Sequence, residues 1–257
     1  MWTRVTACPV GPEARDWIER STAWLADEFG PAPLLRDPVL PTAEHFPGPY
    51  AGTPAEIRGL VQRICKVAGV HPETITVEIE PDSGEDAMVA ELGLTSRSRY
   101  AAGHYRLREG LAVIGIDQRM AARPMALVAT IAHELGHVRL LGEGRISTER
   151  EDHEPLTDLL TVYFGLGVFS ANSAFATTRT HRQQSWQRLG YLSEQQFGYG
   201  LACYAWLRGE RKPDWAGQLT TNPRAYLRHG LRYLRLHGPG PELEALREAL
   251  PQGLADD

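Results

Sequence analysis

The chain has few cysteines, and no apolar run in it approaches the length of a membrane span. Its 257 residues include only three cysteines, widely spaced and without a C-x-x-C pair, so neither a disulfide framework nor a cysteine-based metal site is predicted. No stretch reaches the roughly 18 apolar residues that a transmembrane helix needs, and residues 1–9 lack the apolar segment of a signal peptide. These absences lead us to expect a cytoplasmic protein with no membrane partner.

An excess of positive charge is also missing. The formal net charge is −5, which gives no general attraction to nucleic acid, and no nucleic-acid partner is expected. Hydrophobic residues make up 42% and charged residues 23% of the chain, as in ordinary globular proteins. A chain of this length can bury a full core in one domain or in one domain with an appendage.

The most informative segment present is His133-Glu134-Leu135-Gly136-His137. Residues 123–142 around it predict one continuous helix, with Pro124 at the first position and Gly142 in the left-handed position past its end. Histidines four residues apart lie on one face of a helix, so both can bind the same Zn²⁺, with the glutamate placed as general base beside the reacting water. Burying these three polar groups is costly unless something pairs them, which favours a zinc site.

A catalytic zinc needs a third protein ligand, and the downstream sequence offers two candidates. The metzincin pattern fails, because Leu140 and Glu143 stand where it needs a glycine and a histidine or aspartate. An acidic cluster at residues 151–158 follows and leads into an apolar run. Within it, Glu154 and Asp158 are one helical turn apart and share a face. They are the two candidate ligands, ahead of Glu143 and His153.

The H-E-x-x-H motif followed by this E-x-x-x-D spacing resembles the gluzincin-type zinc metallopeptidases, and among them the small intracellular proteins of the ImmA/IrrE type. That group carries E-x-x-A-N on its ligand helix, where this chain has Glu154-Pro155-Leu156-Thr157-Asp158. The resemblance covers about residues 100–170. It implies Glu154 as third ligand and Asp158 as the carboxylate that orients a ligating histidine. Pro155 departs from the pattern by placing Glu154 at or beside the helix N-cap, so Asp158 as direct ligand stays the alternative.

The resemblance also implies a function. It predicts a zinc-dependent peptidase acting on a peptide or protein substrate, with Glu134 as general base, and by analogy His181 or Tyr191 as the group that stabilises the oxyanion. Two other functions stay open. One is a zinc amidohydrolase that acts on a small amide rather than on peptides. The other is a regulatory or binding protein with a structural zinc site, whose C-terminal helices bind a partner.

The remaining patterns predict an α+β fold that is predominantly helical. The resemblance implies a zincin-like core in which a small sheet packs on the H-E-x-x-H helix and the ligand helix. We expect three regions: an N-terminal helix and proline-rich wrap at 1–53, the metal-binding core at 54–170, and a C-terminal helical region at 171–257. Helices are expected at 12–29 and 54–68, the second opened by a capping box at Thr53 and Glu56. Strands are expected at 74–79, 104–108 and 111–117, the last two joined by a turn at Glu109-Gly110.

Further patterns bear on fold and function. The hairpin at 104–117 is either a wall for an extended substrate, because peptides add readily to sheet edges, or a purely structural pair of strands. The run Leu159 to Phe169 reads as one buried helix, residues 171–191 as poor in regular structure, and Ser193 as the cap of a further helix. The helix after Asn222-Pro223 carries an arginine stripe, which we interpret as a solvated face rather than a binding surface. The stripe consists of Arg224, Arg228, Arg232 and Arg235.

Overall fold

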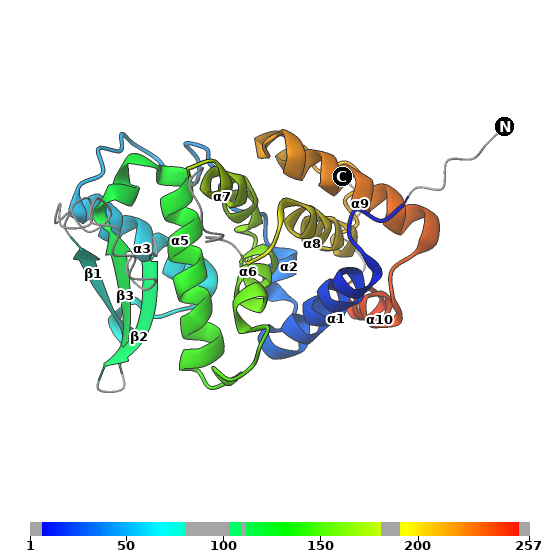
Figure 1. The fold of residues 1–257 in the computed structure, drawn as a ribbon, viewed down its shortest axis with the longest axis horizontal. Coiled ribbons are helices and arrows are strands. Elements are labelled where there is room, and N and C mark those ends of the chain that lie inside the picture. Colours follow the sequence, from blue (N-terminus) through cyan, green and yellow to red (C-terminus); the bar gives the residue numbers. More distant parts are fainter. Residues whose placement is uncertain (1–6, 81–102, 109–110, 181–190, 252–257) are drawn as a thin grey trace. The chain divides into compact units, whose positions relative to one another are not determined.

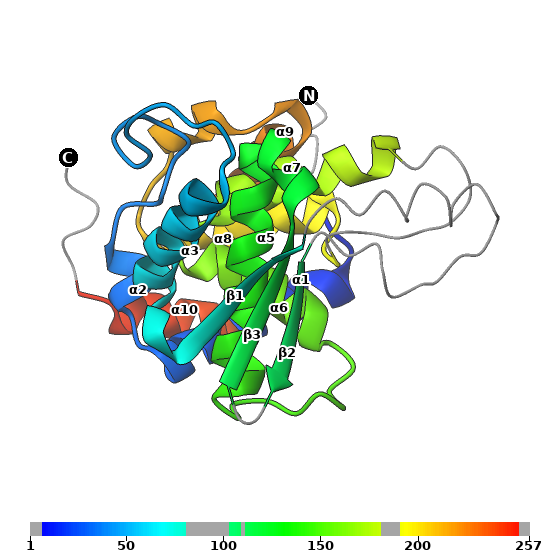
Figure 2. The same ribbon diagram turned by 90° about the vertical axis from the view of Figure 1, so that its left-hand side faces the viewer.

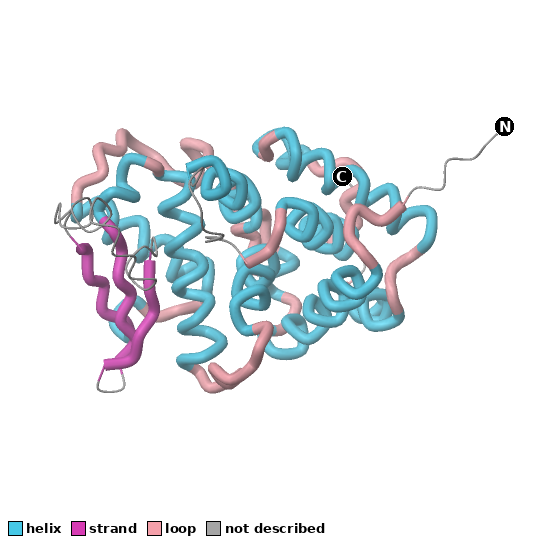
Figure 3. Tube along the Cα trace, viewed as in Figure 1, coloured by secondary structure: helices cyan, strands magenta, loops and turns pink. Residues whose placement is uncertain are grey.

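The computed structural model describes residues 7–80, 103–108, 111–180 and 191–251. They divide into two compact units: Met1–Pro47 with Ser147–Asp257, and Gly48–Ile146. Figure 1 labels the elements, and Figure 3 shows that the described strands all belong to Gly48–Ile146, whereas the described part of the other unit is helices and loops. The predominantly helical α+β class is confirmed. The three predicted regions, 1–53, 54–170 and 171–257, stay a prediction.

The unit Gly48–Ile146 contains a three-stranded sheet in the order β1-β3-β2. β1 (Ile75–Glu80) runs parallel to β3 (Leu111–Asp117), and β2 (Gly103–Arg108) runs antiparallel to it. The central strand β3 is buried from Ala112 to Ile116, as expected of a near-continuous apolar run covered on both faces. The predicted strands are confirmed to within one residue at their ends. The predicted turn at Glu109-Gly110 lies outside the described residues.

Two helices accompany this sheet. α3 (Pro54–Ala68) and α5 (Pro124–His137) pack on each other, and α5 also packs on β2 and β3 (Figure 2). The predicted capping box is confirmed, because the Thr53 hydroxyl accepts the N–H of Glu56 while the Glu56 carboxylate accepts the N–H of Thr53. Short 3₁₀ turns, η1 (Pro72–Thr74) and η2 (Gln118–Ala122), precede β1 and α5. The apolar core includes Ile57, Val61, Ile64, Ile114, Ile116, Leu127 and Ile131.

The end of α5 differs from the prediction. The helix starts at Pro124 as expected, but after His137 it continues as a π-helical segment, η3 (Val138–Gly142). The wider turn changes where the helix stops, and the residue with positive φ is Gly144, at 68°, so the assignment of Gly142 to that position was wrong. Arg139 ties this end of the helix to α3 by donating to the carbonyl of Gly69 at 3.0 Å.

The unit that joins Met1–Pro47 with Ser147–Asp257 is built around a buried helix, α8. α8 packs on α1, α6, α7 and α9, and α10 lies against both α1 and α8. Ser193 caps α8 through a second capping box, as predicted. The carboxylate of Glu19 in α1 accepts hydrogen bonds from the Tyr199 hydroxyl of α8 and from the backbone N–H of Gly240. The helical segments are α1 (Pro12–Phe29), α2 (Ala32–Leu35), α6 (His153–Tyr163), α7 (Gly167–Thr180), α8 (Glu194–Leu207), η4 (Asp214–Gln218), α9 (Thr221–His237) and α10 (Pro241–Ala249).

Two further predictions for this unit were wrong. The run Leu159 to Phe169 is not one helix, because Gly165 takes a φ of 80° between α6 and α7. The first part of 171–191 is not irregular, since α7 extends to Thr180. The helix expected after Asn222-Pro223 is confirmed as α9. Within the described residues, no helix combines the length and apolarity needed to span a bilayer.

Candidate metal centre

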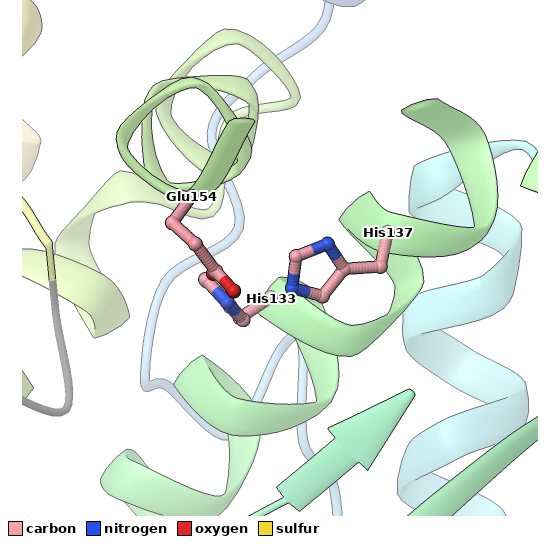
Figure 4. A group of neighbouring side chains, drawn as sticks. All are labelled: His133, His137 and Glu154. Carbon is pink, nitrogen blue, oxygen red and sulfur yellow. The ribbon is translucent and has the colours of Figure 1, made fainter. Parts of the chain in front are cut away.

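Helix α5 presents two histidines on one face of the helix. The ring centroids of His133 and His137 are 4.7 Å apart and the ring planes are nearly perpendicular, at 89°. Figure 4 shows both rings projecting to the same side of α5. His137 is 7% exposed and Glu134 only 5%. The sequence motif therefore becomes, in the folded unit, two imidazoles facing one point beside a buried carboxylate.

The local sequence explains why this segment is a buried helix. Pro124 occupies the first turn, where its missing N–H is harmless. Leu127, Ile131 and Leu135 are fully buried, and α5 packs on α3, β2 and β3. Because the apolar residues of α5 are buried, Glu134 and His137 on the same helix are buried with them. Leaving such polar groups unpaired in the interior costs free energy.

Strand β2 passes directly beside the motif, a feature that the sequence analysis did not include. A Cβ atom built on Gly103 would lie 2.5 Å from Cγ2 of Thr130 and 3.0 Å from Oε1 of Glu134. Only glycine, having no side chain, fits this close approach. Alternation along β2 then places Tyr105 on the same face as Gly103.

Tyr105 is the second residue that the sequence analysis missed. Its ring stacks on the His137 ring, with centroids 5.9 Å apart and planes inclined by 30°. Burial raises the pKa of the Tyr105 hydroxyl above its ordinary value, and that hydroxyl has no hydrogen-bond partner among the described residues. The alternation of the strand showed that Tyr105 and Gly103 share a face. Only the packing of β2 on α5 shows that this face lies beside the histidine motif.

Glu154 and Asp158 lie on α6, in the other unit. Asp152 is the N-cap, so Pro155 lies in the first turn as expected, but Glu154 is the second residue of the helix and the prediction that it lies at or beside the N-cap was wrong. Asp158 is 3% exposed, and its Oδ2 accepts the backbone N–H groups of Tyr191 at 2.7 Å and Leu192 at 3.0 Å. These bonds join α6 to the chain that leads into α8.

His133 and His137 of α5 lie side by side and could both ligate one metal ion (Figure 4). Among the described residues, Glu154 of α6 is the carboxylate that could complete a group of three ligands with them. Asp158 is not a member of the group. Two imidazole nitrogens with one carboxylate oxygen are a donor set that zinc takes in catalytic sites, so the chemistry of these residues fits zinc. Glu154 belongs to a different unit from the histidines, and its role as ligand is therefore part of the proposal below.

Glu143, His181 and Tyr191 were also candidates for the metal site or for stabilising the oxyanion. Glu143 forms ion pairs with Arg139 at 2.6 Å and Arg145 at 2.9 Å, which accounts for its carboxylate without a metal. His181 lies outside the described residues. The side chain of Tyr191 is 44% exposed, and its role in stabilising an oxyanion stays a prediction.

No family model, curated protein or solved structure matches this chain. The resemblance to gluzincin-type peptidases therefore depends on the two motifs alone, and the function is argued from the residues.

Proposed function

We propose that this chain is a zinc-dependent metallopeptidase. The observation that carries the proposal is the pair of histidines on α5 with a 5% exposed glutamate between them. A buried carboxylate beside two imidazoles is costly in a structural helix but is useful when a metal and a reacting proton are both present. His133, His137 and Glu154 would hold the ion, and Asp158 would act in its surroundings.

A zinc ion held there would polarise the scissile carbonyl and lower the pKa of a water molecule. Glu134 then does the proton chemistry. Its carboxylate accepts a proton from the water as the oxygen attacks the carbonyl carbon, and delivers that proton to the amine nitrogen as the C–N bond breaks. Burial of Glu134 keeps bulk water from competing for the proton, and the contact with Gly103 fixes where its carboxylate lies.

An extended peptide is the substrate class that the strand arrangement favours. Among the described strands, β2 has one neighbour, β3, so its other edge offers backbone N–H and C=O groups. Because Gly103 of β2 lies beside Glu134, a peptide added along this edge would pass the general base. Strand addition of this kind supplies affinity through main-chain hydrogen bonds.

We assign the enzyme to the cytoplasm. Cys8, Cys65 and Cys203 are all free thiols, and burial raises the pKa of Cys65 to about 11. Free, protonated thiols suit a reducing compartment.

The substitution Glu134→Gln tests the proposal. The variant should keep zinc, because Glu134 is not a ligand, but lose hydrolysis by at least about 100-fold, since an amide cannot accept the proton. Glu143→Gln is the matched control, because it removes a carboxylate of α5's own C-terminal extension that pairs only with arginines among the contacts described. Zinc content is measured by elemental analysis, and new peptide termini by mass spectrometry after incubation with a proteome-derived peptide library.

Zinc-loaded wild type and Glu143→Gln should generate the same new termini. Equal termini from Glu134→Gln, or none from zinc-loaded wild type, would refute the peptidase. Hydrolysis of small amides without cleavage of peptides would instead support the amidohydrolase.

A further inference from the structure

A cavity of about 800 Å³ lies within the helical unit, away in sequence from the metal-binding motif. The residues that line it come from the C-terminal end of α8, the following residues 209–217, and α9 and α10. This volume is in the range of sites that enclose small molecules or cofactors. The function proposed above makes no use of it.

Basic side chains outnumber acidic ones in the cavity wall. Among the described residues that line it, two are acidic, Glu210 and Asp214. Glu210 is already engaged, because it accepts hydrogen bonds from Arg208 at 2.6 Å and from Trp215 at 2.7 Å. The basic side chains in the wall are Arg211, Lys212, Arg228, Arg232, Arg235 and Arg247. The cavity therefore attracts a ligand with several negative charges.

Arg228, Arg232 and Arg235 of α9 form no ion pair with any other residue that the structure describes. All three residues are exposed. Like charges spaced three or four residues apart repel one another on a helix. An anionic ligand would remove this repulsion, and arginine is the side chain best suited to hold phosphate groups through paired N–H donors.

Part of the cavity wall is apolar and aromatic. Leu227 is fully buried beneath it and Leu231 is half-buried. The guanidinium of Arg247 lies 4.3 Å from the centroid of the Trp206 ring, so a cation is already held against the aromatic surface. Trp206 and Leu231 are both only half-buried, and a bare inorganic anion would make no contact with the apolar surface that they leave exposed. A ligand with both a planar or apolar part and anionic groups would fill both kinds of wall.

We propose that this cavity binds a nucleotide-sized organic phosphate, with its phosphates at Arg228, Arg232 and Arg235 and its base or apolar part at Trp206 and Leu231. A nucleic acid is disfavoured, because the chain carries a net charge of −5 and the basic residues gather in one concave site rather than along an extended track. The site is independent of the zinc-dependent reaction.

Calorimetric titration tests this proposal directly. The purified full-length protein is titrated with ATP, ADP, AMP, inorganic phosphate and a single-stranded oligonucleotide. At least one nucleotide should bind with a micromolar Kd and at least about tenfold more tightly than phosphate, since a nucleotide adds further phosphate groups and a base to the contacts that a single phosphate can make. The double variant Arg228→Ala/Arg232→Ala should weaken that binding at least tenfold.

Two control variants make the result specific to the cavity. Arg58→Ala removes an exposed arginine from α3, in the other unit, and should bind as wild type. His137→Ala should also bind as wild type, which separates this cavity from phosphate binding to a metal. Circular dichroism confirms that each variant is folded.

The proposal is overturned if no nucleotide binds, if phosphate alone binds as tightly, or if the oligonucleotide binds more tightly than every nucleotide. It is equally overturned if the double variant binds as wild type, or if His137→Ala is the variant that loses binding.

Discussion

Helices α5 and α9 both carry ionisable side chains three or four residues apart, but they carry them on opposite kinds of surface. In α5 the motif lies in the interior, with Glu134 and His137 5% and 7% exposed. In α9, Arg228, Arg232 and Arg235 are exposed along one side. Polar residues within an apolar helix indicate function from the sequence alone, because burying polar groups without partners costs free energy. Exposed charged residues have no such free-energy cost. Whether they form a binding site therefore depends on the elements that surround them.

The two helices also differ in what surrounds them. The neighbours of α5 are a sheet and a helix whose apolar residues form a core, and β2 contributes Gly103 and Tyr105 to the motif. α9 lies beside α8, η4 and the cavity wall. The sequence pattern indicated that its arginines form a solvated face. We propose that they bind a ligand because they line the cavity.

The largest expected effect is on zinc affinity and concerns α5 and α6. Wild type should hold about one zinc per chain. His137→Ala and Glu154→Ala should each weaken zinc binding by more than about 100-fold, whereas Asp158→Asn should weaken it by only about 10–100-fold, as expected of a group that orients a ligand. Arg232→Ala in α9 is the control and should bind zinc as wild type. Competitive titration against a chromogenic chelator measures all four.

The ranking of the two acidic variants decides the third ligand. If Asp158→Asn costs more than Glu154→Ala, Asp158 is the ligand and the assignment of Glu154 is wrong. Weak zinc binding by wild type itself, not restored by dialysis against Zn²⁺, would remove the basis of the proposed enzyme.

A smaller effect is expected at the contact between β2 and α5. Gly103→Ala places a methyl group 2.5 Å from the Thr130 side chain, and overpacking of this kind costs about 1–3 kcal/mol of unfolding free energy. The matched control is Gly59→Ala, because a Cβ at Gly59 in α3 meets nothing within 4 Å and alanine favours a helix by up to about 1 kcal/mol. Urea denaturation should give opposite signs for the two variants. A loss no greater for Gly103→Ala than for Gly59→Ala would show that β2 does not press on Glu134.

Local sequence signals predicted the elements well, because each of those signals acts within a few residues. Pro124 and the Thr53 capping box located helix starts, and the alternating runs located the strands to within one residue. Gly144 was missed because the π turn of η3 shifted the helix end, which the spacing of apolar residues does not reveal. The sequence pattern likewise predicted Gly165 within a helix. In the structure its positive φ separates α6 from α7.

Contacts between residues far apart in the sequence limited how much of the candidate sites could be predicted. The histidine pair needs one helix only, so the motif predicted it. Gly103 and Tyr105 reach the motif through sheet pairing and packing on α5, which no local pattern encodes. The cavity is lined by residues of α8, α9 and α10 together, and for that reason the arginine stripe alone could not reveal it.

The smallest expected effect sharpens the contrast between buried and exposed charge. Arg228→Ala/Arg232→Ala should change the free energy of unfolding by less than about 0.5 kcal/mol, because both side chains are exposed and without ion pairs to described residues. Arg208→Ala is the comparison in the same unit. The side chain of Arg208 is 6% exposed and donates to the carbonyls of Leu34 and Arg36 and to Glu210, so its loss should cost about 3–5 kcal/mol. Urea denaturation without added ligand measures both. If the α9 double variant loses as much stability as Arg208→Ala, its arginines serve the fold, and the argument that they are kept for an anionic ligand fails.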